Sequence, residues 1–139
     1  MSEVFTAVGS ALYSKLAGGT ALVSKLGGTA IWDTLVPQAT GTPYVVFNYS
    51  GGGDENLSPV RTRNLVYTVK TVTSGFSGKL QGEQIDGLVD GLLHMGTLTL
   101  TGWNNWWMAR TSDVAYTEMA GGTVFWHRGG QYRIRIVDP

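Results

Sequence analysis

The sequence contains no cysteine and few charged residues. Its 139 residues include 10 basic and 10 acidic side chains, so that 14% of the chain is charged, against about 25% in an average domain. The lack of cysteine excludes a disulfide framework and a thiolate metal site. Because the charges cancel, no excess positive charge is available to neutralise phosphates, which argues against nucleic-acid binding as the main function.

Glycine and aromatic residues, in contrast, are abundant. There are 20 glycines, five tryptophans and six tyrosines, and the glycine share is about twice the usual one. A surface poor in charge but supplied with aromatic side chains is typical of a protein that covers much of itself with other protein. The length suits one domain and no linker divides the chain, so we expect a single domain over residues 1–139.

The first residues predict neither a signal peptide nor a membrane span. The start, Met1 to Phe5, includes an acid and no basic cluster, and Lys15 and Lys25 interrupt the apolar pattern that follows. A secretory leader needs a basic start before an unbroken apolar run, and a span needs about 20 apolar residues.

Apolar residues at helical spacing predict three helices, over residues 2–16, 20–26 and 78–95. We expect Ser2 and Thr20 to cap the first two, which end before glycine pairs. In the third helix the apolar residues share one arc of the helical wheel. Those residues are Ile85, Leu88, Val89, Leu92 and Leu93.

Alternating and β-branched runs predict strands over residues 31–32, 44–50, 64–74, 98–100, 106–118 and 123–137. Gly129-Gly130 is expected to break or bulge the last strand. Residues 51–63, with three glycines and mixed charges, are expected to form a mobile loop. The order of elements predicts an α+β fold, a mostly antiparallel β-sheet with helices packed on one face.

The sequence offers no catalytic constellation. His94 and His127 have no partner at a metal-ligand spacing, and Ser77 lacks the spacing of a nucleophile elbow. The glycines at 51–53 precede two acids, which repel phosphate, and we expect the pairs Asp54-Glu55 and Asp86/Asp90 to be solvated. We therefore expect no enzymatic activity, no cofactor and no metal site.

Three features are better suited to interfaces, and each has a simpler alternative. Gly87 and Gly91 weaken the long helix, so either a partner packs on the bare backbone or tertiary packing tolerates them. The loop with Asp54, Glu55, Arg61 and Arg63 either orders on a neighbour or is a solvated connection.

The third feature is the tryptophan-rich hairpin at residues 103–108. Strand alternation places Trp106 and Met108 on one face and Trp107 on the other. Such a strand either lies between core layers, which the usual burial of tryptophan favours, or exposes one face, with Trp106, to a partner.

An ordered set of residues carries a resemblance to a known family. It begins with Leu12-x-x-x-Leu16, Leu22-x-x-x-Leu26-Gly27 and Ile31-x-Asp33, and continues with Pro37-Gln38 and Pro43-Tyr44-Val45-Val46-Phe47. Together with the later helix, the Leu-Thr-Leu segment and the closing Tyr132-Arg133-Ile134-Arg135-Ile136, this resembles the tail-completion, or tail-terminator, proteins of long-tailed bacteriophages. The sequence departs from the family in its tryptophan-rich segment, its glycine-rich helix and its triple-glycine loop.

The resemblance implies a structural role in the virion. Such subunits form a homo-oligomeric ring, typically a hexamer, that caps the tail tube, stops its polymerisation and joins it to a head-completion or neck protein. Assembly in the host cytoplasm, a place at the head-proximal end of the tail, and DNA that only passes through the lumen are also implied. Two alternatives remain: another head–tail connector component, and a small-molecule binding domain or hydrolase that uses His94 or His127.

Overall fold

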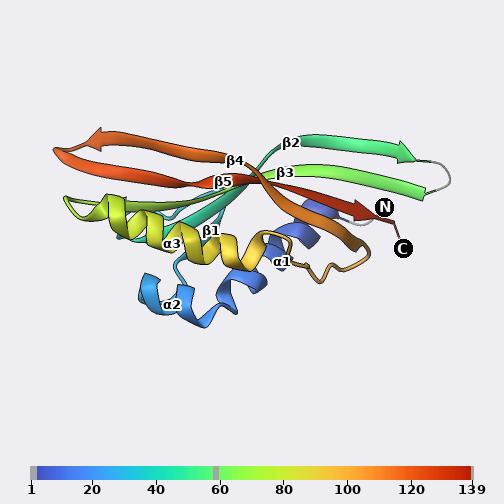
Figure 1. Cartoon of the computed structure of the whole chain (residues 1–139), viewed down its shortest axis with the longest axis horizontal. Helices are drawn as coiled ribbons and strands as arrows, with labels where there is room; N and C mark the ends of the chain where they lie inside the picture. Colours follow the sequence, from blue (N-terminus) through green and yellow to red (C-terminus); the bar gives the residue numbers. More distant parts are fainter. Residues whose placement is uncertain (1–2, 58–59, 139) are drawn as a thin grey trace.

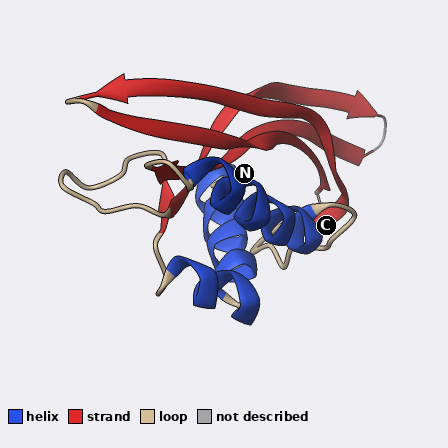
Figure 2. Ribbon diagram, turned by 60° about the vertical axis from the view of Figure 1, so that its left-hand side comes forward, coloured by secondary structure: helices blue, strands red, loops and turns tan. Residues whose placement is uncertain are grey.

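The protein is an α+β domain in which three helices cover one face of a five-stranded sheet. The computed structural model describes residues 3–57 and 60–138. The elements are α1 (Val4–Ala17), α2 (Thr20–Leu26), β1 (Ile31–Asp33), β2 (Tyr44–Leu57), β3 (Val60–Ser74), α3 (Gly78–Leu93), β4 (Asn104–Ala120) and β5 (Thr123–Val137). The strand order is β1-β2-β3-β5-β4, and only the short β1 runs parallel to its neighbour. The helices lie together below the sheet (Figures 1 and 2), so the predicted fold class is confirmed.

The core lies between the helices and the sheet. Strand residues at every second position and helix residues on one arc meet there, as their periodicities require. The fully buried members include Leu12, Leu16, Phe47, Leu65, Val69, Ile85, Leu93, Ile134 and Ile136. Burial of each such side chain stabilises the fold by about 1.5–3 kcal/mol. The core therefore fixes the helices to a single face of the sheet.

The N-terminal helices match the prediction, although their caps differ. Ser2 lies outside the described residues, and Glu3 precedes the first helical residue, Val4. Thr20 is the first residue of α2 rather than its cap, and Gly19 holds the cap position. Gly27 ends α2 with φ 75°, a conformation that favours glycine.

The expected mobile loop at residues 51–63 is instead the end of a long β-hairpin, so this prediction is wrong. β2 continues past a register shift between Tyr49 and Gly51 and pairs with β3 as far as Leu57 and Val60. Gly52, at φ 124°, lies so close to β3 that a Cβ atom there would be 2.9 Å from Leu65 Cα. The absence of a side chain at Gly52 therefore allows the close pairing of the two strands at this place.

Two predictions for the C-terminal half also need correction. Leu98 and Leu100 form no strand, since the amide of Leu98 donates to the Asn105 side chain and Leu98 packs into the core. The register shifts in this hairpin lie in β4, between Asn105 and Trp107 and between Arg110 and Ser112. Gly129 and Gly130 stay in register with β3, so no bulge occurs there.

The first shift in β4 changes the faces on which the tryptophans lie. Trp106 is the extra residue of this bulge, so it leaves the face of buried Met108 and is 58% exposed. Trp107 is 36% exposed, whereas Trp103 is buried. The core interpretation is therefore correct for Trp103 and wrong for Trp106 and Trp107.

Candidate interface

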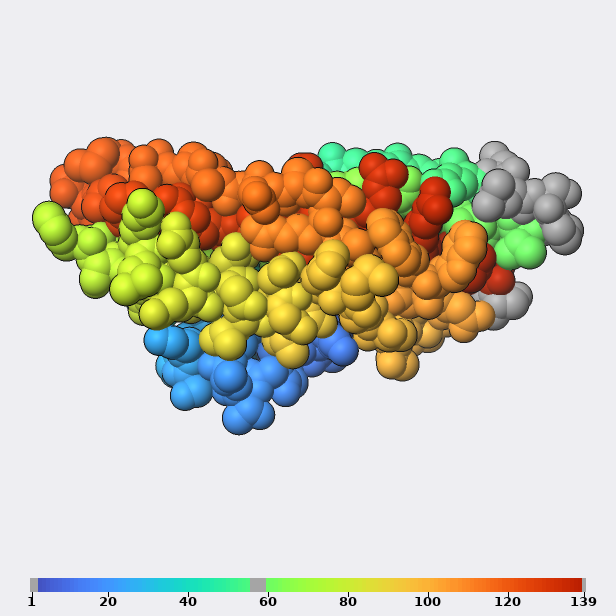
Figure 3. Space-filling model, in the orientation of Figure 1, coloured from blue at the N-terminus to red at the C-terminus, as the bar shows by residue number. Residues whose placement is uncertain are grey.

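Two hairpin arms extend from the sheet in opposite directions. The β2–β3 hairpin ends at one extreme of the molecule and the β4–β5 hairpin at the other (Figures 1 and 3). Almost every residue of β4 from Thr111 to Ala120 is exposed, so this part of β4 has little packed against its side chains. An elongated domain with two long arms presents distinct surfaces at its two ends.

The charged residues expected to meet a neighbour through the β2–β3 arm pair within the chain. Asp54 lies 2.7 Å from Arg61 and 3.2 Å from Arg63, and Glu55 lies 2.9 Å from Arg135. The expectation that Asp54 and Glu55 are simply solvated is therefore wrong. Pairs this exposed contribute about 0–1 kcal/mol each, so they add little to the stability of the arm.

Aromatic contacts connect the base of the β2–β3 arm to α1. Phe5 meets Tyr49 edge to face, with ring centroids 4.7 Å apart, and Tyr49 meets Tyr67 at 5.7 Å. The Arg63 guanidinium lies over the Phe5 ring. Burial raises the pKa of Tyr67 to about 12, so its hydroxyl stays neutral at physiological pH.

Gly87 and Gly91 lie on the exposed face of α3, as the apolar arc predicts. A Cβ atom at either position would contact nothing within 4 Å. The face is therefore open, and the structure brings these glycines into contact with none of the other predicted interface residues.

We expect Gly87→Ala to raise the free energy of unfolding by about 0.5–1 kcal/mol, because alanine loses less backbone entropy in a helix. Urea denaturation monitored by circular dichroism measures the change. Gly82→Ala is the matched control on the buried side of α3, where the new Cβ would lie 3.1 Å from Thr73 Oγ1. A loss of stability in Gly87→Ala would show that this face is not free in the isolated protein.

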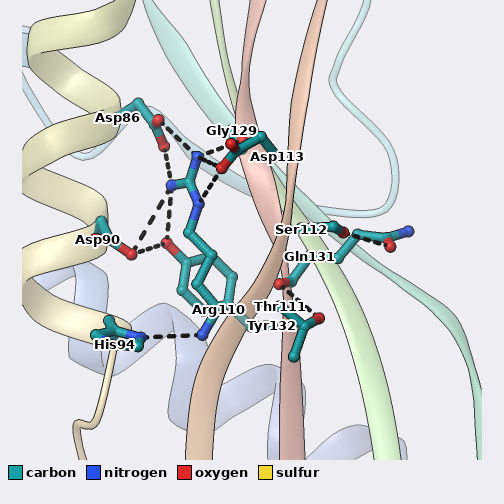
Figure 4. Close-up of polar contacts among 10 residues, drawn as sticks. All are labelled: Asp86, Asp90, His94, Arg110, Thr111, Ser112, Asp113, Gly129, Gln131 and Tyr132. Carbon is teal, nitrogen blue, oxygen red and sulfur yellow. Dashed lines mark hydrogen bonds and ion pairs between the residues drawn. The ribbon is translucent and has the colours of Figure 1, made fainter.

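Arg110 connects α3 to both strands of the C-terminal hairpin, in a network that the sequence did not predict. Its guanidinium donates to both carboxylate oxygens of Asp86, at 2.9 and 3.0 Å, and to the carbonyl of Gly129 at 2.7 Å (Figure 4). Nε donates to Asp113 at 3.0 Å. The hydrogen bonds to Asp86 above all, and that to Tyr132, raise the pKa of Arg110 above its ordinary value, so the residue is a permanent cation.

Tyr132 extends this network to the next turn of α3. Its hydroxyl donates to Asp90 at 2.9 Å, and burial raises its pKa above the ordinary value (Figure 4). Asp86, expected to be solvated, is instead only 19% exposed and pairs bidentately with Arg110. The two α3 carboxylates therefore connect helix to sheet.

The histidines have separate environments. His94 ends α3, where its Nδ1 accepts the backbone amide of Arg110 at 3.1 Å. His127 is buried, stacks on Tyr116 and lies 2.6 Å from Glu118. Burial lowers the pKa of His127, so at neutral pH its ring is uncharged and Nε2 donates to Glu118.

Neither histidine is part of an apparent metal site. Within residues 3–57 and 60–138, no group of three or more His, Asp or Glu side chains is placed to hold a metal ion. Of the helices in these same ranges, none is both long and apolar enough to cross a bilayer.

Trp106 lines a groove that contains residues missed by the sequence analysis. The groove measures about 490 Å³ and is formed by Trp106, Trp107, Thr111, Arg133 and Arg135. The signal was present in the sequence, since Arg133 and Arg135 alternate with Ile134 and Ile136, which face the core. The arginines therefore lie on the sheet face away from the helices, beside the exposed tryptophans.

The chain belongs to the family of the tail completion protein gp17, whose pattern it matches over residues 10–135. The resemblance inferred from residues 12–136 is thus confirmed, and the family is one of structural phage proteins.

Solved structures show the same fold. A chain in the virion of a native gene transfer agent particle matches with a TM-score of 0.82 and 17% identity over 99% of both chains. A second solved chain matches with a TM-score of 0.60 and 13% identity over 96% of both. None of the curated proteins compared with the chain matches it.

Proposed function

We propose that this protein forms a ring that caps the phage tail tube, stops its polymerisation and joins it to the head or neck. The observation that carries the proposal is membership of the tail completion family over residues 10–135. The fold shared with a chain of a phage-like virion, at a TM-score of 0.82, supports it. The protein then belongs at the head-proximal end of the tail, after assembly in the host cytoplasm.

The shape of the domain is compatible with a ring of identical subunits. A contact that joins one surface of a subunit to a different surface of its neighbour is head-to-tail. Repetition of such a contact closes a ring when the rotation between neighbours is a whole fraction of a full turn. The two arms and the open face of α3, with Gly87 and Gly91, are the proposed contact surfaces. The tail-tube protein, the neck protein and further copies of this chain are the proposed partners, and DNA passes through the lumen.

Removal of the gene tests the role directly. We expect particles that lack this protein to carry tail tubes of uncontrolled length that do not join heads, as seen by negative-stain microscopy. Complementation with the wild-type gene restores both length and joining. Tubes of normal length that only fail to join would contradict tube capping and favour the second candidate, a connector component nearer the portal.

A further inference from the structure

We propose that the groove formed by Trp106, Trp107, Arg133 and Arg135 binds the tip of the β4–β5 hairpin of a second copy, centred on Glu118 and Met119. The inference rests on the proposed ring, because it identifies the contact between neighbouring subunits. It is carried by charge and exposure at the two ends of the β4–β5 hairpin. At one end Arg133, which has no ion pair among the described residues, shares a groove with two exposed tryptophans, and at the other end Glu118 and Met119 are exposed.

The groove lies where β4 begins and β5 ends. Trp107 pairs with Arg135, and Ala109 with Arg133, so these residues share the sheet face away from the helices. Trp106 is 58% exposed and Trp107 is 36% exposed. In an isolated domain this arrangement leaves large aromatic surface in water, which favours a protein partner.

Charge narrows the choice of partner to an anionic one. Arg135 is already paired with Glu55 and lies over the Trp106 ring. Arg133 has no ion pair among the residues that the structure describes, and its buried Nε has no hydrogen-bond partner there. The groove therefore carries one uncompensated positive charge in the same lining as two exposed indoles, which suits a carboxylate.

The tip of the β4–β5 hairpin carries a carboxylate and a thioether, on opposite faces of β4, because neighbouring residues of a strand alternate. Residues 114–124 contain one charged side chain, Glu118, which is 54% exposed. Its partner within the chain, His127, is neutral at neutral pH because burial lowers its pKa, so the negative charge of Glu118 is not balanced there. Met119 is 71% exposed, and a thioether packs favourably against an aromatic ring, with a gain of about 0.3–1.5 kcal/mol.

A neighbouring loop adds apolar surface at the same end. The amide of Gly75 donates to the carbonyl of Val124, so the segment with Phe76 lies beside the tip. Phe76 is completely exposed. The end of the molecule opposite the groove thus presents an acid on one face of the sheet and a thioether on the other, with a phenyl ring beside the tip.

The distance between the two surfaces makes the contact intermolecular. Trp107 and Glu118 are eleven residues apart on one strand, which corresponds to roughly 36 Å at about 3.3 Å per residue. Both lie on the same face of the sheet, since Glu118 pairs with Phe125 and Trp107 with Arg135. A tip therefore cannot reach the groove of its own chain, and repetition of the contact builds a head-to-tail chain that can close.

Charge reversal gives a specific test. In Arg133→Glu the groove repels the Glu118 of a neighbour, and in Glu118→Arg the tip repels Arg133. We expect each variant alone to self-associate at least tenfold more weakly than wild type by sedimentation velocity at low salt. An equimolar mixture of the two, and the double variant E118R/R133E, should both recover association, because every tip then meets a groove of opposite charge.

Two controls separate the weaker self-association from misfolding and from an unspecific effect of the changed net charge. Lys15→Glu reverses one charge on α1, away from both surfaces, and should leave association unchanged. The circular dichroism spectrum of each variant should match wild type. Weakening by Arg133→Glu or Glu118→Arg without recovery in the mixture would overturn the proposed contact.

Cross-linking tests the same contact without a change of charge. Because the chain has no cysteine, Met119→Cys and Thr111→Cys each introduce a single thiol, one at the tip and one in the groove. We expect the double variant to form a disulfide-linked ladder of subunits under mild oxidation, on tail tubes as well as in solution. The absence of any ladder where wild type assembles would overturn the proposal.

The outcomes distinguish this inference from the proposed function. If Arg133→Glu and Glu118→Arg still cap tails, the ring stands and this contact is wrong. If wild type forms no oligomer in solution or on tubes, the ring itself is wrong. If Arg133→Glu lowers the affinity for duplex DNA and leaves association unchanged, the groove faces nucleic acid and the proposal is overturned.

Discussion

Replacement of Arg110 with alanine is expected to lower the free energy of unfolding by about 3 kcal/mol. Removal of one partner from a largely buried ion pair leaves the other charge uncompensated, which costs about 3–5 kcal/mol when burial is complete. Arg110 is 17% exposed and Asp86 is 19% exposed, so we take the lower end of that range. The melting temperature should fall by roughly 10 °C for a domain of this size.

Urea denaturation of Arg110→Ala, Asp86→Asn and the double variant measures the effect and its origin. If the pair is the cause, the double variant should be less destabilised than the sum of the single variants. Arg61→Ala is the matched control, because its pair with Asp54 is about one-third exposed and should contribute less than about 1 kcal/mol. Equal effects of Arg110→Ala and Arg61→Ala would contradict the central place of Arg110.

Gly129→Ala is expected to destabilise the protein by about 3 kcal/mol or to prevent folding. A Cβ atom at this position would collide with the carbonyl oxygen of Val69 and lie 2.5 Å from Lys70 Cα, both in the backbone of β3. Backbone atoms in the middle of a sheet cannot move aside cheaply, and overpacking of this kind costs about 1–3 kcal/mol or more. The carbonyl of Gly129 also accepts from Arg110, so a shift of β5 would disturb the ion network.

Gly53→Ala is the matched control for this prediction. Gly53 also lies in a strand, β2, but a Cβ atom there would meet nothing within 4 Å. We expect its stability to equal or slightly exceed that of wild type, since alanine restricts the unfolded chain more than glycine does. Thermal denaturation of both variants decides the point, and a tolerated alanine at position 129 would contradict the close approach of β3 and β5.

Local patterns were enough to predict the helices and most of the strands, because apolar spacing determines which face of each element meets the core. The arc of Ile85, Val89 and Leu93 on α3 is an example, since all three are buried. The same reasoning failed for the β2–β3 arm, where a run of glycines predicts mobility unless the close partner strand is known. Only the register with β3 reveals that Gly52 needs its small size.

The candidate site was less predictable, because it depends on contacts between distant residues. Arg110 and Asp86 are 24 positions apart in the sequence, and nothing near either one indicates the pair. The bulge at Trp106 inserts one residue into β4 and reverses the alternation that was expected to place it with Met108. A one-residue shift thus decides whether a tryptophan belongs to the core or to the surface.

The position of β4 at the end of the strand order has a consequence for how the protein avoids aggregation. An edge strand of 17 residues presents unpaired amides and carbonyls to which another sheet could add. Both of its register shifts lie in the first half, between Asn105 and Ser112, where they interrupt the regular ladder. Strand addition at this edge is therefore disfavoured near the groove. Addition of strands from further copies is thus discouraged at the place where neighbouring subunits are proposed to meet. Contacts through side chains are favoured there instead, and such contacts set a defined angle between neighbours.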